Sequence, residues 1–233
     1  MSPPLVRGVR AAFVFLTRIP VGGFPYSPED WRWAVAHFPF VGAVVGALTA
    51  IVFVALLPVG AFAAAILAFG ASALITGAFH EDGLADTSDA LGGGYTREKV
   101  AAILKDSRVG TFGASALVVS FVGRAALLER LGVDALWALP FVAATARAAA
   151  VWQSFALPYV TAPEQSKSHS VVNPSLAHAL VASSWAALAI ALALHFSHDS
   201  RRLAIALALC ALVTLVTGAR YRRRLGGVTG DFL

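Results

Sequence analysis

The sequence predicts an all-α protein that crosses a membrane about six times, a class indicated by its composition and by the length of its apolar runs. Hydrophobic residues make up 58% of the 233 residues and charged residues only 13%, whereas an ordinary soluble domain is about one quarter charged. The mean hydropathy is +0.74. Six apolar runs approach the roughly 20 residues that a helix needs to cross the hydrocarbon core. They lie at about 33–57, 60–79, 110–128, 135–157, 175–195 and 203–218.

The segment before the first run is too short to cross a membrane. Arg18 and Pro20 end the apolar stretch 11–16, and no small-residue cleavage site follows, so we do not expect a signal peptide. Because basic residues flank its aromatic ones, we expect a helix that lies at the membrane interface. Thr17 and Arg18 come at its end, where Arg18 either reaches toward interfacial water or contacts a phosphate.

Gly42 and Gly46 stand four residues apart near the start of the first run, just after Pro39. Small residues at this spacing allow two membrane helices to approach closely, so we interpret the pair as a packing face. His37 lies next to the proline, and the sequence does not decide between a structural and a functional role for it. The second run then delivers His80 and the carboxylates that follow it to the membrane boundary.

The stretch after the second run concentrates the polar chemistry of the chain. If residues 82–89 are helical, Asp82, Asp86 and Asp89 stand at i, i+4 and i+7 and share one face. Like charges at this spacing cost a helix roughly 0.2–0.5 kcal/mol per pair, so we expect a cation between them. Carboxylate oxygens without cysteine indicate a hard ion, and Mg²⁺ typically takes one or two carboxylates together with substrate phosphate.

The glycines at 92–94 are predicted to end this helix through positive φ angles and to form a hinge. Thr96 is predicted to cap a short helix that ends in Lys105-Asp106-Ser107-Arg108, with Gly110 close behind. Two cations, a hydroxyl and the backbone N–H groups that open the third run are suited to hold a phosphate. A basic flank on the cytoplasmic side is the alternative, and the nearby carboxylates favour the phosphate interpretation.

Arg124 and Arg147 lie inside apolar runs. A charge in a span marks a functional site or an ion pair, and the sequence leaves both open for Arg147. Cys210 is the only cysteine, which excludes an intrachain disulfide and a Cys-based zinc site, and we interpret it as a packing residue. The chain closes with a glycine-rich turn that ends in Asp231.

Lys and Arg are distributed unevenly between the connections. They concentrate before the first run, after the second, after the fourth and after the sixth, while the alternate connections carry only Arg130, Arg201 and Arg202. Because cytoplasmic connections carry the basic excess, both chain ends and the acidic stretch are predicted to be cytoplasmic. The pI near 9.9 therefore reflects contact with the lipid bilayer, and we expect no nucleic-acid partner.

Taken together, these motifs resemble the cobalamin synthase family, the adenosylcobinamide-GDP ribazoletransferases of bacterial inner membranes. The matching motifs are Thr17-Arg18-Ile19-Pro20, Phe38-Pro39 with Gly42, His80 to Thr87 with Asp89, Lys105 to Arg108 with Gly110, and Gly226 to Asp231. They are spread over nearly the whole chain, so we treat residues 1–233 as one integral membrane transferase domain. Members of the family usually continue into a closing apolar helix, and we therefore expect the native chain to extend beyond Leu233.

The resemblance implies a Mg²⁺-dependent enzyme that joins α-ribazole, or its 5′-phosphate, to adenosylcobinamide-GDP and releases GMP. It further implies that Asp82, Asp86 and Asp89 hold the metal with Glu81 as a further ligand. Lys105 and Arg108 would offset charge on the departing GMP, and His80 is the candidate general base, or else orients a carboxylate. The expected substrate-binding residues are Thr17, Arg18, Gly92, Gly93, Asp106, Ser107, Arg147 and Asp231.

The resemblance also implies a multi-pass protein of the bacterial inner membrane with its active site on the cytoplasmic side. A homo-oligomer, or an assembly with other enzymes of the corrinoid pathway, is compatible with it. Two rival functions remain at this stage. A CDP-alcohol phosphatidyltransferase also uses a helical Asp cluster, but Asp82-Gly83-Leu84-Ala85-Asp86 departs from that motif. A divalent-cation transporter would place its carboxylates near the bilayer midplane rather than in a connection.

Overall fold

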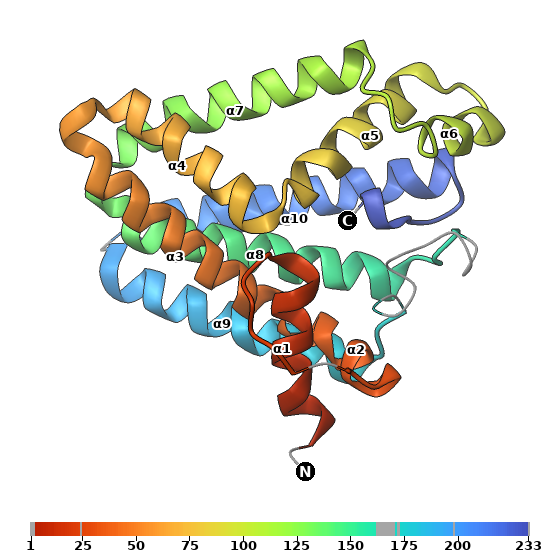
Figure 1. Ribbon diagram of the computed structural model, residues 1–233, viewed down its shortest axis with the longest axis horizontal. Helices are drawn as coiled ribbons and strands as arrows, with labels where there is room; N and C mark the ends of the chain where they lie inside the picture. Colours follow the sequence, from red (N-terminus) through yellow and green to blue (C-terminus); the bar gives the residue numbers. More distant parts are fainter. Residues whose placement is uncertain (1–2, 24, 162–170, 172, 198, 233) are drawn as a thin grey trace.

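The computed structural model describes residues 3–23, 25–161, 171, 173–197 and 199–232, and every regular element within these residues is helical (Figure 1). This confirms the predicted all-α class. The α-helices are α1 (Pro4–Leu16), α2 (Pro28–Ala34), α3 (Phe38–Leu56), α4 (Ala61–Thr76), α5 (Phe79–Gly93), α6 (Arg97–Ile103), α7 (Thr111–Leu131), α8 (Ala135–Ala156), α9 (Leu176–Ser197) and α10 (Ser200–Arg224). A final 3-10 turn, η5, spans Gly230–Phe232.

All six apolar runs form helices. Judged by length and composition, four helical stretches can cross a membrane, and α4 with α5 would make a fifth if that bent pair is one span. One of the four stretches holds both α7 and α8, which are separated at Gly132, where φ is 53°. The chain is therefore a polytopic membrane protein, whereas the count of about six crossings stays a prediction.

Helices α3 and α8 pack against each other in the centre of the bundle. A Cβ atom on Gly46 would lie 2.5 Å from the carbonyl oxygen of Leu139, and one on Gly42 would lie 2.6 Å from that of Ala143. A larger residue would push the two backbones apart. The predicted packing role of the two glycines is confirmed.

The chain bends by 95° between α4 and α5. Gly77 and Ala78 make the turn, with φ angles of 69° and 58°, a left-handed conformation that glycine adopts at little cost. Helix α5 thus leaves the direction of α4 and packs against α7 (Figure 1). Because α5 carries the carboxylates and α4 carries none, we place α5 outside the membrane-spanning segments.

The segment expected at the membrane interface is helical and packs against α2. Arg7 Nε donates a hydrogen bond of 2.8 Å to the Asp30 carboxylate. His37, which follows α2, is buried. Its Nδ1 accepts a hydrogen bond from Trp185 Nε1 at 3.1 Å, and its Nε2 therefore donates to the carbonyl of Leu5 at 2.8 Å. Both ring nitrogens make hydrogen bonds to other parts of the bundle, so the structure gives His37 a structural role.

The connections separate into two opposite ends of the bundle (Figure 1). The turns from α3 to α4, from α7 to α8 and from α9 to α10 lie at one end, while α5, α6 and the end of α10 lie at the other. The end with α5 and α6 is the one that the distribution of Lys and Arg predicts to be cytoplasmic, and that orientation stays a prediction.

The segment after α10 folds back toward the acidic helix. Val228 pairs with the chain beside Tyr159, because the N–H of Val228 donates to the carbonyl of Pro158 at 2.9 Å and the N–H of Val160 donates to that of Val228 at 3.0 Å. Turn η5 then packs on α5. The last glycine-rich block of the sequence is thereby placed beside the first acidic one.

Candidate active site

Helix α5 has the predicted helical conformation and presents Asp82 and Asp86 toward Asp231 of η5. Burial, followed by the charges of Asp82, Asp231 and Asp89, raises the pKa of Asp86 to about 6. Carboxylates that raise one another's pKa in this way lie near enough for their charges to interact. The structure therefore gathers an acidic cluster, which we define as Asp82, Asp86 and Asp231.

Asp231 is held in this cluster by its backbone. Thr87 Oγ1 donates a hydrogen bond of 2.7 Å to the carbonyl of Asp231. A Cβ on Gly83 would lie 3.0 Å from the same carbonyl oxygen, so the glycine allows η5 to approach the helix. Burial, with an added effect from Asp82, raises the pKa of Asp231. Sequence analysis selected Asp231 for substrate binding and included Thr87 in the acidic motif, but it did not predict the contact between them.

Asp89 is engaged differently from the other two helix aspartates. Its two carboxylate oxygens accept hydrogen bonds from the backbone N–H groups of Gly110, at 2.7 Å, and Gly113, at 2.9 Å. A carboxylate in this place satisfies unpaired donors and complements the positive end of the α7 dipole. The N–H groups of Gly110 and Gly113 are thus occupied by Asp89 in this structure, and phosphate binding at the start of α7 stays a prediction. Binding of a metal by Asp89 stays a prediction.

The acidic cluster fits a hard cation in its chemistry, because every donor in it is a carboxylate oxygen. Among the described residues, however, no three His, Cys, Asp or Glu side chains are arranged closely enough to form a complete metal site. This arrangement suits Mg²⁺ bound by one or two carboxylates and completed by water and substrate phosphate, rather than a protein-only cage.

Glu81 and Arg124 form an ion pair between α5 and α7, with 3.5 Å between Glu81 Oε1 and Arg124 Nη2. The Arg124 guanidinium also lies over the rings of Phe69 and Phe121. The second oxygen of Glu81, Oε2, is buried and has no hydrogen-bond partner among the described residues. Sequence analysis singled out both charges but did not pair them, since they are far apart in the chain. The predicted ligand role of Glu81 remains a prediction.

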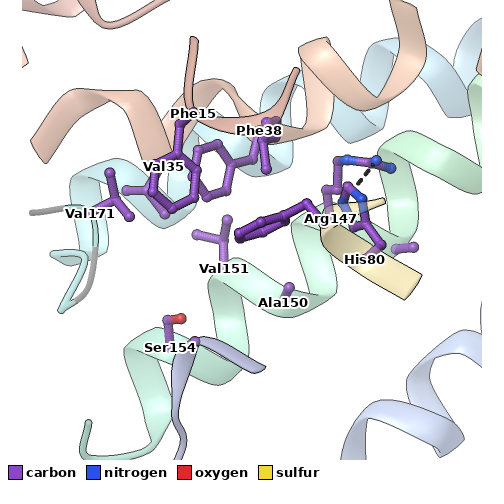
Figure 2. A pocket seen from close by; sticks show the side chains of 13 residues that line it. Phe15, Val35, Phe38, His80, Arg147, Ala150, Val151, Ser154 and Val171 are labelled. Atoms are coloured by element: carbon purple, nitrogen blue, oxygen red, sulfur yellow. Dashed lines mark hydrogen bonds between the residues drawn. The ribbon is translucent and has the colours of Figure 1, made fainter. Parts of the chain in front are cut away.

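Arg147 of α8 reaches His80 in the first turn of α5. Its Nη2 lies 3.0 Å from His80 Nε2, and its Nη1 donates to the carbonyl of Ala143 (Figure 2). Because a guanidinium only donates, His80 Nε2 is the acceptor and the proton of the neutral ring is on Nδ1. Burial, followed by the charges of Arg147 and Arg124, lowers the pKa of His80 to about 3. His80 is therefore neutral and hydrogen-bonded in this geometry, and its role as a general base stays a prediction.

Lys105 lies in an open cavity of about 460 Å³ that also contains Thr229 and Asp231. One cation from the α6–α7 connection thus faces the acidic cluster. Arg108 lies in a neighbouring cavity and is paired with Asp106, its Nε and Nη2 donating to both carboxylate oxygens at 2.7–3.2 Å. Ser107 between them is exposed. Lys105 thus shares a cavity with Asp231, whereas Arg108 shares one with Asp89 and is paired with Asp106.

A further cavity, of about 130 Å³, lies beside His80 and is mostly apolar (Figure 2). Phe15 and Phe38 form one wall, Ala150 and Val151 of α8 form the wall opposite, and the His80–Arg147 pair closes one end. We call it the apolar cavity. Sequence analysis did not foresee it, because its walls come from α1, η1 (Val35–His37), α3, α5 and α8.

The remaining predicted residues have structural contacts. Thr17 Oγ1 donates to the carbonyl of Phe13 and accepts from the N–H of Ile19, which ends α1. The Arg18 side chain crosses Gly77 at the α4–α5 bend. Gly92 packs on the ring of Phe112, and Gly93 lines the cavity that holds Arg108.

The glycines at 92–94 do not have positive φ angles. The prediction that such angles end α5 is therefore wrong. A close approach explains Gly94, since a Cβ there would lie 2.9 Å from the backbone nitrogen of Val100 in α6. The substrate-binding roles of Gly92 and Gly93, and of Thr17 and Arg18, stay predictions.

Comparison with known proteins gives matches over almost the whole chain. A family model described as Cobalamin-5-phosphate synthase matches residues 8–233. Proteins named adenosylcobinamide-GDP ribazoletransferase are 39% identical in a Polaromonas species, over 98% of this chain and 91% of that protein, and 40% identical in Leptothrix cholodnii, over 98% and 90%. The protein of that name from Vibrio cholerae is 38% identical over 95% of this chain and 85% of its own length. No solved structure matches the chain significantly.

Proposed function

Because the chain belongs to the cobalamin-5-phosphate synthase family, we propose that it is the membrane transferase that joins α-ribazole, or its 5′-phosphate, to adenosylcobinamide-GDP and releases GMP. The observation that carries this proposal is the match of residues 8–233 together with relatives of that name at 38–40% identity. The matched region includes the acidic cluster, Lys105 and the apolar cavity.

In this reaction a ribose hydroxyl oxygen attacks the phosphorus that carries the cobinamide, and the bond from that phosphorus to the oxygen of GMP breaks. The hydroxyl proton passes to solvent water, and negative charge grows on the departing GMP. Catalysis of such a transfer depends mainly on positioning and on offsetting charge. Lys105 faces the acidic cluster across one cavity and would bind a phosphate oxygen there. Arg108 could join it only after releasing Asp106.

We propose Asp82 and Asp86 as the residues that hold Mg²⁺, with Asp231 beside them. When bound, the ion would neutralise phosphate charge and bring the two substrates together. Asp89 would contribute indirectly, because it fixes the start of α7 against α5. The crowding that raises the pKa of Asp86 to about 6 is what an added cation would relieve.

We do not propose His80 as the general base. Its Nε2 lone pair already accepts from Arg147, and a ring whose pKa is about 3 is a weak base at neutral pH. The alternative interpretation of its contacts, a neutral ring held by a guanidinium at the end of the apolar cavity, suits substrate binding. Arg147 then acts through His80 as a positioning residue.

We place the protein in the inner membrane with α5, α6 and η5 on the cytoplasmic side. The support is the predicted basic excess at the same end of the bundle. Both nucleotide-containing and ribazole substrates are polar, and this end presents the polar cavities.

The test is GMP release by the purified chain in detergent. We expect release only when adenosylcobinamide-GDP and α-ribazole are both present, with loss of activity in a chelator and recovery with added Mg²⁺. A CDP-alcohol donor should give no CMP, which separates the rival phosphatidyltransferase. Release of GMP without α-ribazole, or full activity in the chelator, would contradict the transferase and the metal proposals respectively.

A further inference from the structure

We propose that the apolar cavity binds the benzimidazole base of the ribazole acceptor, with His80 donating a hydrogen bond to the base. This assignment rests on the proposed function and adds the place and orientation of one substrate.

The walls of the cavity suit a flat aromatic ring. Phe15 and Phe38 are stacked, with ring centroids 5.4 Å apart and an angle of 14° between the rings, and Phe79 meets Phe15 edge-on at 5.6 Å. Val35 and Val151 complete the lining with aliphatic surface. A dry apolar cavity of about 150 Å³ is enough to bind benzene. The volume of about 130 Å³ here, open on one side, accommodates an aromatic ring whose remainder projects outward.

The polar end of the cavity offers one directed donor. His80 Nε2 accepts from Arg147, so the ring proton is on Nδ1. His80 Nδ1 has no hydrogen-bond partner among the described residues, and it is not completely buried. The unsubstituted nitrogen of a benzimidazole is an acceptor with no proton of its own, which matches this donor. A lipid acyl chain could occupy the same cavity, but it has no acceptor for the N–H group of His80 Nδ1.

The neighbouring cavities give the bound acceptor a direction. Gly230 and His80 line both the apolar cavity and a second one that contains Asp231. Asp231 in turn lines the cavity that contains Lys105. A base seated beside His80 would therefore project its ribose past Gly230 toward the acidic cluster. The reacting hydroxyl and the donor phosphates would then meet between Asp231 and Lys105.

The first test compares two matched truncations. Phe79→Ala removes a ring from the cavity, and Phe62→Ala makes the same change at the other end of the bundle, with similar exposures of 41% and 39%. We expect Phe79→Ala to raise the KM for α-ribazole and its equilibrium Kd about tenfold. The KM for adenosylcobinamide-GDP should stay within about twofold of wild type, and Phe62→Ala should change neither constant.

Two outcomes separate this inference from the proposed function. Unchanged α-ribazole binding in Phe79→Ala, in a protein that still releases GMP, overturns the cavity assignment and leaves the function intact. Binding of α-ribazole that depends on Phe79 supports the assignment even in a preparation without turnover, which would instead contradict the function.

The second test concerns the hydrogen bond. A riboside with an indole base lacks the acceptor nitrogen, and we expect wild type to bind it about tenfold more weakly than the benzimidazole riboside, in line with one hydrogen bond. In His80→Phe the preference should disappear, while His80→Asn, which can still accept from Arg147 and donate, should keep part of it. A preference that persists in His80→Phe would assign the hydrogen bond to another group.

Discussion

Asp82 and Asp89 belong to the same acidic helix, but the structure gives them different roles. Asp82 contributes repulsion to Asp86 and Asp231, whereas Asp89 accepts two backbone hydrogen bonds at the start of α7. We therefore expect Asp82→Ala to abolish GMP release without lowering the thermal midpoint of unfolding, because a like charge is removed. Asp89→Ala should abolish activity as well, and should also destabilise the protein by about 1 kcal/mol through loss of the cap.

The measurement for both variants is thermal unfolding of the detergent-solubilised protein alongside GMP release. Asp89→Asn serves as the control, since its amide oxygen can replace one of the two acceptors. Retained turnover at saturating Mg²⁺ in Asp82→Ala and Asp86→Ala together would refute the metal site. An unchanged midpoint in Asp89→Ala would refute the cap.

Arg124 and Glu81 offer a test of the ion pair between α5 and α7. Glu81 is nearly buried, with 14% of its side chain exposed, so Arg124→Ala leaves a carboxylate without its partner. We expect a loss of about 1–3 kcal/mol in unfolding free energy, measured as a lower midpoint in detergent. Arg124→Met combined with Glu81→Gln should recover most of the loss, because no charge is then stranded. Equal midpoints for the single and double variants would contradict the pairing.

At the residue scale, the sequence predicted which charged side chains matter better than it predicted which residues they contact. The periodicity of 3.6 placed Asp82 and Asp86 on one face, and the rarity of charge in a span singled out Arg124 and Arg147. Their partners come from other helices, and no local pattern encodes a contact such as that of Thr87 with Asp231, 144 residues away.

At the scale of elements, the contact of α3 with α8 depends on Gly46. Gly46→Ala places a methyl group 2.5 Å from a backbone carbonyl oxygen, which cannot move aside as a side chain would. We expect a destabilisation of about 1–3 kcal/mol, measured by thermal unfolding. Gly70→Ala in α4 is the matched control, because no heavy atom lies within 4 Å of its added Cβ. It should be neutral or slightly stabilising, because alanine has a higher helix propensity than glycine. Equal losses in both variants would show that the loss at Gly46 does not come from the contact of α3 with α8.

The connection from α6 to α7 is tested by Arg108→Lys. The Arg108 side chain is 85% exposed and held only by Asp106 in the structure, so a membrane-flank role would tolerate the change. If the guanidinium transfers from Asp106 to two phosphate oxygens, lysine cannot reproduce the planar contact. We expect about a tenfold loss in turnover, roughly 1.4 kcal/mol of barrier, with unchanged expression. Wild-type kinetics would support the alternative, that Arg108 is only a basic residue flanking the membrane.

Helices were predictable as elements because each apolar run is long and continuous. The 95° bend between α4 and α5 was not, since hydropathy reports burial in lipid and carries no information on chain direction. The only local signal was Gly77 beside Ala78, and a single glycine is too common among these helices to mark a turn.

At the scale of the whole molecule, the orientation in the membrane can be tested by cysteine labelling in a Cys210→Ser background. Tyr95→Cys and Arg223→Cys lie at the end with α5, and Val133→Cys lies at the opposite end; all three positions are exposed. We expect a membrane-impermeant thiol reagent to reach the first two only from the cytoplasmic side and Val133→Cys only from outside. Labelling of Tyr95→Cys from outside would invert the predicted orientation.

The return of the chain through Val228 to η5 has a consequence for biosynthesis. A nascent chain that has been made as far as Arg224 already contains helices α1 to α10, yet it lacks Asp231 and the bridge beside Tyr159. The residues of helices α1 to α10 are therefore made before the residue that completes the acidic cluster. Partly synthesised copies would occupy the membrane without being able to carry out the transfer.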